Sequence, residues 1–134
     1  MNNQIIQPKI LLTDLMNPQN FKDADLEELP PWPDEMILKG PIKHWEKAVH
    51  IGEEIVGVIY KATAGEIYSP GYPFDQSVVI LEGSLILIPE GGDEIHLKKG
   101  DIFQLPKGYK GKWIMPEDYK EYIVVEKKSW LENQ

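Results

Sequence analysis

Short apolar runs rich in β-branched residues follow one another along the chain from about residue 46 onward. Gly, Pro and Asp residues separate these runs, and no long amphipathic helix pattern accompanies them. The expected strands cover residues 47–51, 54–62, 77–81, 84–88, 94–97, 102–105, 112–115 and 119–126. Short strands with turn residues between them predict an all-β sandwich or barrel.

The first 45 residues have a different pattern, because prolines punctuate this segment. Residues 10–12 are a candidate strand, and residues 23–29 are a candidate helical turn that begins at an Asp N-cap. We therefore divide the chain into three parts. These are an N-terminal arm (1–45) that packs on the barrel or on a partner, the barrel itself (46–128) and a C-terminal tail (129–134).

Both faces of two central strands are apolar, in Val78-Val79-Ile80-Leu81 and in Leu85-Ile86-Leu87-Ile88. A half-exposed antiparallel strand alternates with polar residues, so the outer face here needs a cover. We expect the arm, a partner subunit or both to supply it, and we expect a homodimer. If Glu82-Gly83 closes a tight hairpin, the covered face carries Val79, Leu81, Ile86 and Ile88.

Composition narrows the classes of partner and site. The 134 residues suit one domain, with a net charge of −8, no Cys and no Arg. An acidic surface repels phosphate backbones, and Arg forks are missing, so we expect no nucleic-acid partner. No apolar run reaches the ~18 residues of a membrane helix, so we expect no membrane partner. The N-terminus lacks the pattern of a secretion signal, and we expect a cytoplasmic protein.

One motif is more specific than the strand pattern. Its main part consists of Gly100, Asp101, Pro106, Gly108, Gly111, Trp113, Lys120 and Tyr122. Two shorter pieces precede it in the chain, first Tyr60, Thr63, Ala64 and Gly65, and then the turn Leu81-Glu82-Gly83. Over residues 57–126 this order and spacing resemble the cupin superfamily. More narrowly, they resemble the small cupins of the ethanolamine-utilisation and ureidoglycine aminohydrolase cupin-domain type. The resemblance implies a cupin barrel (a double-stranded β-helix, jelly-roll-like) with an N-terminal arm.

Metal-binding cupins carry His-x-His, Glu and a final His at positions that correspond here to Pro70, Tyr72, Gln76 and Gly111. Pro and Gly offer no side-chain ligand, and Gln and Tyr are poor ligands for a first-row metal. We therefore expect no metal and no cofactor. The three histidines lie at other positions, and a different site that combines them with a nearby glutamate is a second hypothesis. It would draw on His44, His50 and His96 with Glu46, Glu53 or Glu94.

The candidate site lies inside the barrel. Alternation along the strands turns Gln76 and Trp113 inward, if Gln76 keeps the orientation of the ligand that it replaces. The predicted ligand-binding residues are Tyr68, Tyr72, Gln76, Trp113 and Tyr122. An aromatic interior with a few polar groups suits a small-molecule ligand. The alternative is that the same aromatic side chains simply fill the barrel.

Two residues are candidates for acid–base chemistry. A desolvated Lys120 would act as a base or form a Schiff base, and Glu66 lies near the expected barrel mouth. Alternatively, Lys120 reaches water or pairs with a carboxylate such as Glu82 or Glu121.

These observations leave three hypotheses for function. The first is a metal-free cupin that binds a small molecule. The second is an enzyme of the aminohydrolase, lyase or isomerase type, with Lys120, Glu66 or a tyrosine as acid or base. The third is a structural accessory protein with a filled barrel.

Overall fold

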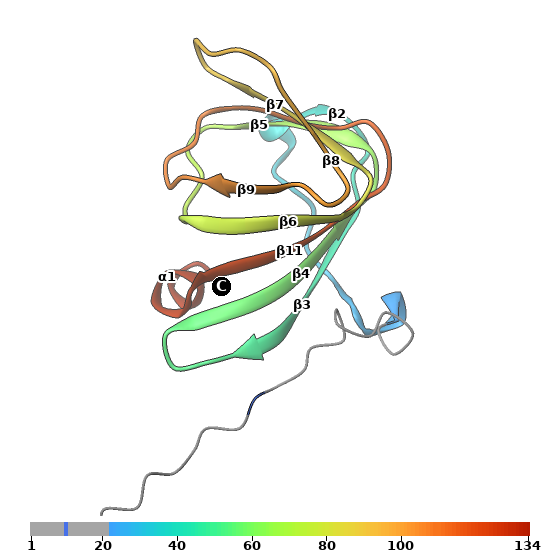
Figure 1. The fold of residues 1–134 in the computed structure, drawn as a ribbon. Coiled ribbons are helices and arrows are strands. Elements are labelled where there is room, and N and C mark those ends of the chain that lie inside the picture. Colours follow the sequence, from blue (N-terminus) through green and yellow to red (C-terminus); the bar gives the residue numbers. More distant parts are fainter. Residues whose placement is uncertain (1–9, 11–21) are drawn as a thin grey trace, which may run out of the picture.

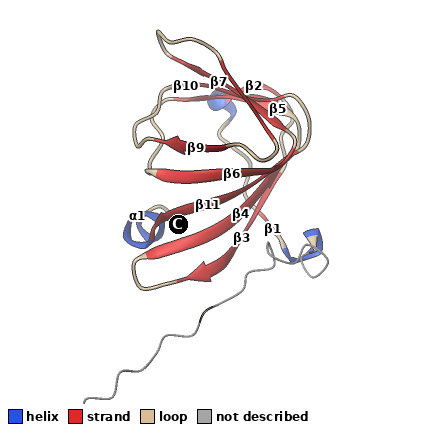
Figure 2. Ribbon diagram, in the orientation of Figure 1, coloured by secondary structure: helices blue, strands red, loops and turns tan. Residues whose placement is uncertain are grey.

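The computed structural model describes residue 10 and residues 22–134, so the candidate strand at 10–12 falls mostly outside the described residues. The described chain folds into two antiparallel β-sheets that face each other (Figure 1). The prediction of an all-β fold is confirmed. Figure 2 shows that helix is confined to short segments of the described chain, and none of its helices is long and apolar enough to cross a membrane.

The larger sheet, sheet A, has six strands in the order β1-β3-β4-β11-β6-β9. Their bounds are Glu27–Glu28 (β1), His44–Ile51 (β3), Ile55–Ala62 (β4), Tyr119–Glu126 (β11), Gln76–Glu82 (β6) and Ile102–Leu105 (β9). The smaller sheet, sheet B, has five strands in the order β2-β5-β10-β7-β8. Their bounds are Ile37–Lys39 (β2), Gly65–Ser69 (β5), Gly111–Met115 (β10), Ser84–Pro89 (β7) and Ile95–Lys98 (β8).

The core lies between the inner faces of the two sheets. Alternate residues of each strand point into it, as the period of two requires. On β6 these are Gln76, Val78 and Ile80, all of which are buried, while the residues between them are half-buried. On β10 they are Trp113 and Met115, which are also buried.

The chain crosses from one sheet to the other at Gly83. Strand β6 pairs with β11 and β9, whereas β7 pairs with β10 and β8, so Glu82-Gly83 does not close the tight hairpin on which a shared outer face depended. Gly83 has a φ of +82°, and a Cβ there would lie 2.3 Å from the carbonyl oxygen of Asp118. Only glycine fits this corner. In consequence, Val79 and Ile86 do not share one surface.

Parts of the predicted arm are edge strands. Strand β1 pairs with β3 in sheet A, and β2 pairs with β5 in sheet B. The expected helical turn is a 3-10 turn at Asp23–Asp25 (η2), and a second one covers Asp34–Met36 (η3). A short helix, α1 at Lys127–Glu132, follows β11 and packs beside β4 and β11 (Figure 1).

Candidate functional site in the barrel interior

A row of polar side chains crosses the inner face of sheet A. The strand register aligns Glu46 of β3 with Tyr60 of β4, and Tyr60 with Glu121 of β11. The next row aligns His44 with Ala62 and Tyr119 in the same way. Residues in register on adjacent antiparallel strands lie on the same face, so these polar groups gather in one region.

Glu121 is the buried acid of this region. Its side chain is only 3% exposed, and Tyr119 donates a hydrogen bond of 2.7 Å from Oη to Oε2 of Glu121. Burial raises the pKa of the Glu121 carboxyl to about 7, although the Tyr119 hydrogen bond opposes part of this change. A carboxyl with a pKa near neutrality exchanges a proton readily at physiological pH.

His44 connects this region to the segment that precedes β3. Its Nε2 lies 2.6 Å from the carbonyl oxygen of Pro30, and its Nδ1 lies 3.0 Å from Tyr60 Oη. A carbonyl oxygen only accepts, so Nε2 carries the proton and Nδ1 accepts from the Tyr60 hydroxyl. The Trp32 ring covers the imidazole at 5.0 Å between centroids. Burial lowers the pKa of His44, which favours this neutral form.

Tyr72 and Gln76 form the other side of the region. Tyr72 Oη donates to Gln76 Oε1 at 3.1 Å, and burial raises the pKa of Tyr72. Two backbone hydrogen bonds hold the Tyr72 loop in place: the Gly108 N–H donates to the Tyr72 carbonyl, and the Tyr72 N–H donates to the Tyr109 carbonyl. The Gln76 side chain is 3% exposed, and its Nε2 has no hydrogen-bond partner among the described residues. A buried amide without a partner costs roughly 1–3 kcal/mol in a folded protein.

Trp113 supplies an apolar wall from sheet B. It is 7% exposed and packs against Phe103 and Tyr119, at 6.4 Å and 6.1 Å between ring centroids. Tyr72 and Tyr60 pack against the same hydrophobic cluster. The structure therefore brings together three of the predicted interior residues, Tyr72, Gln76 and Trp113.

The residues at the metal-ligand positions of the cupin resemblance do not fit a metal. Gly111 has a φ of +152°, and a Cβ there would lie 2.3 Å from the carbonyl oxygen of Ile88. This backbone leaves no space for a ligating side chain. The oxygen of Gln76 accepts from Tyr72, and no three His, Asp or Glu side chains of the described chain gather in a metal-binding group.

A sequence model of the EutQ-like cupin domain matches residues 52–122, which is more than half of the chain. The chain belongs to the EutQ-like cupin family. A search of curated proteins found no match.

Solved structures show the same fold at low sequence identity. A protein of unknown function from Pseudomonas syringae pv. tomato has a TM-score of 0.68 at 16% identity, over 75% of this chain and 43% of its own. The Clostridium difficile EutQ protein has a TM-score of 0.57 at 14% identity, over 73% and 80%. A putative ethanolamine utilization protein Q from Salmonella typhimurium has a TM-score of 0.55 at 18% identity, over 63% and 69%.

Two predicted ligand-binding residues of this EutQ-like cupin lie on outer faces. Tyr68 aligns with Lys112 on sheet B, next to the inward-facing pair Ile67 and Trp113, and it donates a hydrogen bond to Glu90. Tyr122 neighbours the inward-facing Glu121 and lies on the opposite face of sheet A. There its hydroxyl lies over Gly57, whose Cβ would be 2.5 Å from Tyr122 Oη. Neither side chain joins the interior group.

The two candidate catalytic residues also lie on outer faces. Glu66 aligns with Ile114 on sheet B and borders a surface hollow with Lys39 and Ile86. Lys120 aligns with Lys61 and Glu82 on the outer face of sheet A.

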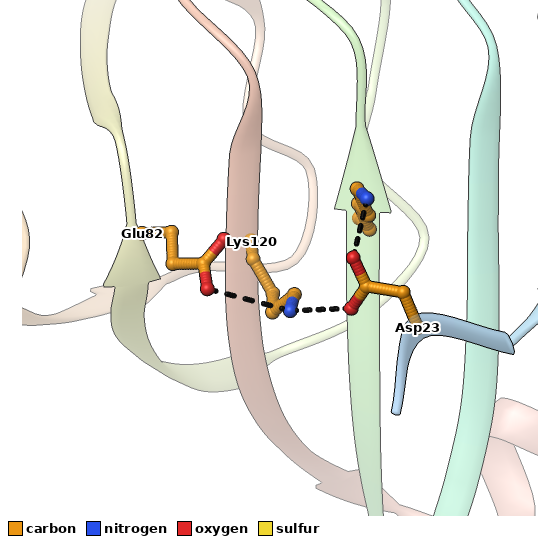
Figure 3. Close-up of polar contacts among 4 residues, drawn as sticks. Asp23, Glu82 and Lys120 are labelled. Carbon is orange, nitrogen blue, oxygen red and sulfur yellow. Dashed lines mark hydrogen bonds and ion pairs between the residues drawn. The ribbon is translucent and has the colours of Figure 1, made fainter. Parts of the chain in front are cut away.

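Lys120 takes part in an ion-pair network that connects the arm to sheet A. Its Nζ lies 2.6 Å from Asp23 Oδ1 and 3.5 Å from Glu82 Oε1 (Figure 3). The other oxygen of Asp23 lies 2.6 Å from Lys61 Nζ. Hydrogen bonds from both lysines lower the pKa of Asp23. This network gives Lys120 a role in holding η2 against β4 and β11, away from the interior site.

Sequence reasoning missed the most unusual members of the interior group, Glu121, Tyr119, Tyr60 and His44. Each face of strand β11 carries both polar and apolar residues. The sequence of this strand alone therefore does not reveal which face is buried. Only the pairing of β4 with β11 brings these residues together, because Glu121 lies opposite Tyr60, about sixty residues earlier in the chain. The signal that would have found them is therefore the register between these two strands.

Proposed function

We propose that this EutQ-like cupin binds a small molecule inside the barrel, beside Glu121, Tyr72 and Gln76, without a metal. The observation that carries the proposal is the Gln76 Nε2 atom, a buried donor without a hydrogen-bond partner among the described residues. Natural proteins keep few such groups, because each lowers stability unless another molecule completes the hydrogen bond. A ligand oxygen or nitrogen would complete it.

The surroundings of Gln76 support this proposal. Aromatic walls from Trp113, Phe103 and Tyr72 combine with a few polar groups at fixed positions, which is typical of small-molecule sites. The polar groups stand on paired strands or on a loop that backbone hydrogen bonds hold in place. A rigid scaffold of this kind reduces the entropy lost when a ligand binds.

A second candidate function is proton transfer on the bound molecule. Its support is the Glu121 carboxyl, whose pKa of about 7 suits a general acid or base. The reaction class would be an isomerisation, an elimination or a hydrolysis that begins with proton transfer. In this version Glu121 takes the place that the sequence assigned to Lys120 or Glu66, which both lie on outer faces.

The test is a small-molecule screen read by thermal shift and confirmed by calorimetric titration. We expect at least one ligand to raise the Tm of the wild-type protein. That shift should disappear in Gln76→Leu, which lacks the amide, and persist in Glu117→Gln, which changes an exposed carboxylate near β11. A ligand that binds both variants equally would place binding elsewhere. Failure of every compound to bind, with normal folding, would favour the accessory-protein hypothesis.

Two further proposals concern the state of the protein in the cell. We propose a homodimer, because half-buried apolar residues remain on the outer faces of both sheets, including Val79, Ile86 and Ile88. We also propose a cytoplasmic location, because a chain without cysteine needs no oxidising compartment.

A further inference from the structure

The outer face of sheet B carries a stripe of isoleucines on two of its inner strands, β10 and β7 (Figure 2). The strand register aligns Ile114 with Ile86, and Ile88 lies on the same side of β7 as Ile86. Their neighbours Leu87 and Trp113 point into the core and are buried, whereas the three isoleucines are half-buried. The water-facing side of an antiparallel sheet normally carries polar residues, so this stripe is suited to a contact.

This face is open in the single chain. A hollow of about 420 Å³ lies on it, and Ile86, Ile114 and Glu66 are among the residues that line the hollow. The outer face of sheet A differs, because the arm already covers part of it. There Asp23 pairs with two outward-facing lysines, and the outward-facing Ile59 is fully buried. The centre of the outer face of sheet B therefore has room for a partner.

Side chains of opposite charge type flank the isoleucine stripe. On one side, Glu66 of β5 is in register with the isoleucine of β10. On the other side, His96 of β8 is in register with the isoleucine of β7, and Lys98 follows on the same face. Nε2 of His96 lies 3.0 Å from Glu94, so Nδ1 of the protonated ring can donate to a second carboxylate. The row thus runs from an acid, across two isoleucines, to basic groups.

This order is self-complementary. A two-fold axis that lies in the interface and runs along the strands, between β10 and β7, exchanges these two strands between the copies. Ile114 of each copy then faces Ile86 of the other, and β5 lies opposite β8 of the other copy. The axis preserves the level along the strands, so Glu66 lies opposite His96 of the second copy and near its Lys98. Symmetry makes every such contact twice.

We propose that a second copy of this chain covers the outer face of sheet B, with Glu66 of each copy bound to His96 of the other. The inference rests on the proposed homodimer and adds its interface and its alignment. Lys112 of β10 also comes to lie near Glu94 of the second copy, because β10 faces β7, the strand beside Glu94. Burial of the isoleucines favours association, and the charge pairs select the alignment.

The charges also disfavour the other symmetric arrangement. If the two-fold axis ran across the strands, each strand would face its own copy. Glu66 would then face Glu66, and His96 would face His96. Like charges in such an interface weaken binding, so the axis along the strands is the arrangement that these residues select.

The experiment exchanges the two charges and measures dimer dissociation. Glu66→Lys places an ammonium opposite His96 and Lys98 of the second copy, and His96→Glu places a carboxylate opposite Glu66. Each variant alone should dissociate at least about tenfold more readily than the wild-type protein, because like charges meet twice in each dimer. A one-to-one mixture of the two variants should form a heterodimer about as stable as the wild-type dimer. In it, one charge pair is reversed in sign and the other is native.

Sedimentation velocity with a fluorescent label on the N-terminal amine of one variant identifies the heterodimer. Glu54→Lys is the control, because Glu54 is exposed and directly precedes β4 of sheet A, so this variant should dissociate as the wild type does. Far-UV circular dichroism checks that all variants are folded. A wild-type dimer that neither substitution weakens, or variants that do not restore each other when mixed, would overturn this interface and leave the homodimer standing. A wild-type protein that stays monomeric at every concentration would overturn the homodimer itself.

Discussion

The pH dependence of stability should change when Glu121 is replaced by glutamine. Gln has nearly the same shape, and its oxygen can still accept the hydrogen bond from Tyr119. The substitution removes the charge that the buried carboxyl acquires at high pH, and it adds an amide NH2 whose hydrogen bonding does not change with pH. We therefore expect the stability of Glu121→Gln relative to the wild-type protein to increase as the pH rises.

The sign follows from the raised pKa of Glu121. Its carboxyl titrates at about 7 in the folded protein and near 4.5 in an unfolded chain, so the folded state holds its proton more tightly. Below pH 4.5 both states are protonated and the carboxyl has no effect. As the pH rises from about 4.5 to about 7, the wild-type protein loses about 3 kcal/mol of stability from this group, which the glutamine variant does not lose.

Urea unfolding at several pH values measures this difference. Between about pH 5 and about pH 8, the difference in free energy of unfolding should change by about 2–3 kcal/mol in favour of the variant. The m-value should stay the same, because both proteins bury similar surface. Glu117→Gln is the control, because this carboxylate is exposed. Parallel pH profiles for Glu121→Gln and wild type would refute the argument that burial raises this pKa.

Four other results are expected. Trp113→Ala should lower the free energy of unfolding by about 3–5 kcal/mol in thermal melts, because it empties a large part of the core. Asp23→Ala should destabilise the protein by about 1 kcal/mol, less at high salt, whereas the same change at exposed Asp25 should have little effect. Elemental analysis of untagged protein should find less than one transition metal per chain. Size-exclusion chromatography with light scattering should show a dimer, and Ile86→Glu should shift it toward monomer.

Most of the strands were predictable, because apolar alternation and turn residues are local signals. The expected strands at 102–105 and 119–126 match β9 and β11. Strands β1, β2 and β5 were missed. The first two are two and three residues long and lie among prolines. Strand β5 (Gly65–Ser69) has five residues, of which only Ile67 and Tyr68 are large and apolar or aromatic. The sequence left open whether Glu82-Gly83 closes a hairpin, because a tight turn and a crossing between sheets have the same local sequence pattern.

The candidate site was predictable only in part. Tyr72, Gln76 and Trp113 came from motif positions and strand period, which are properties of single segments. Glu121 and its tyrosine neighbours depend on the pairing of distant strands, which no single segment encodes. A hydrophobicity pattern also assigns a glutamate to the surface, because an unpaired charge is costly to bury.

The position of β11 has a consequence for folding during synthesis. This strand is the last of sheet A in chain order, but it lies between β4 and β6 and pairs with both. Until Tyr119–Glu126 leaves the ribosome, β3 and β4 have no strand through which to join β6 and β9. The nascent chain must therefore hold two incomplete halves of sheet A with unpaired strand edges, which are sites for aggregation. A chain that is truncated before residue 119 would lack the strand that joins β4 to β6 in sheet A.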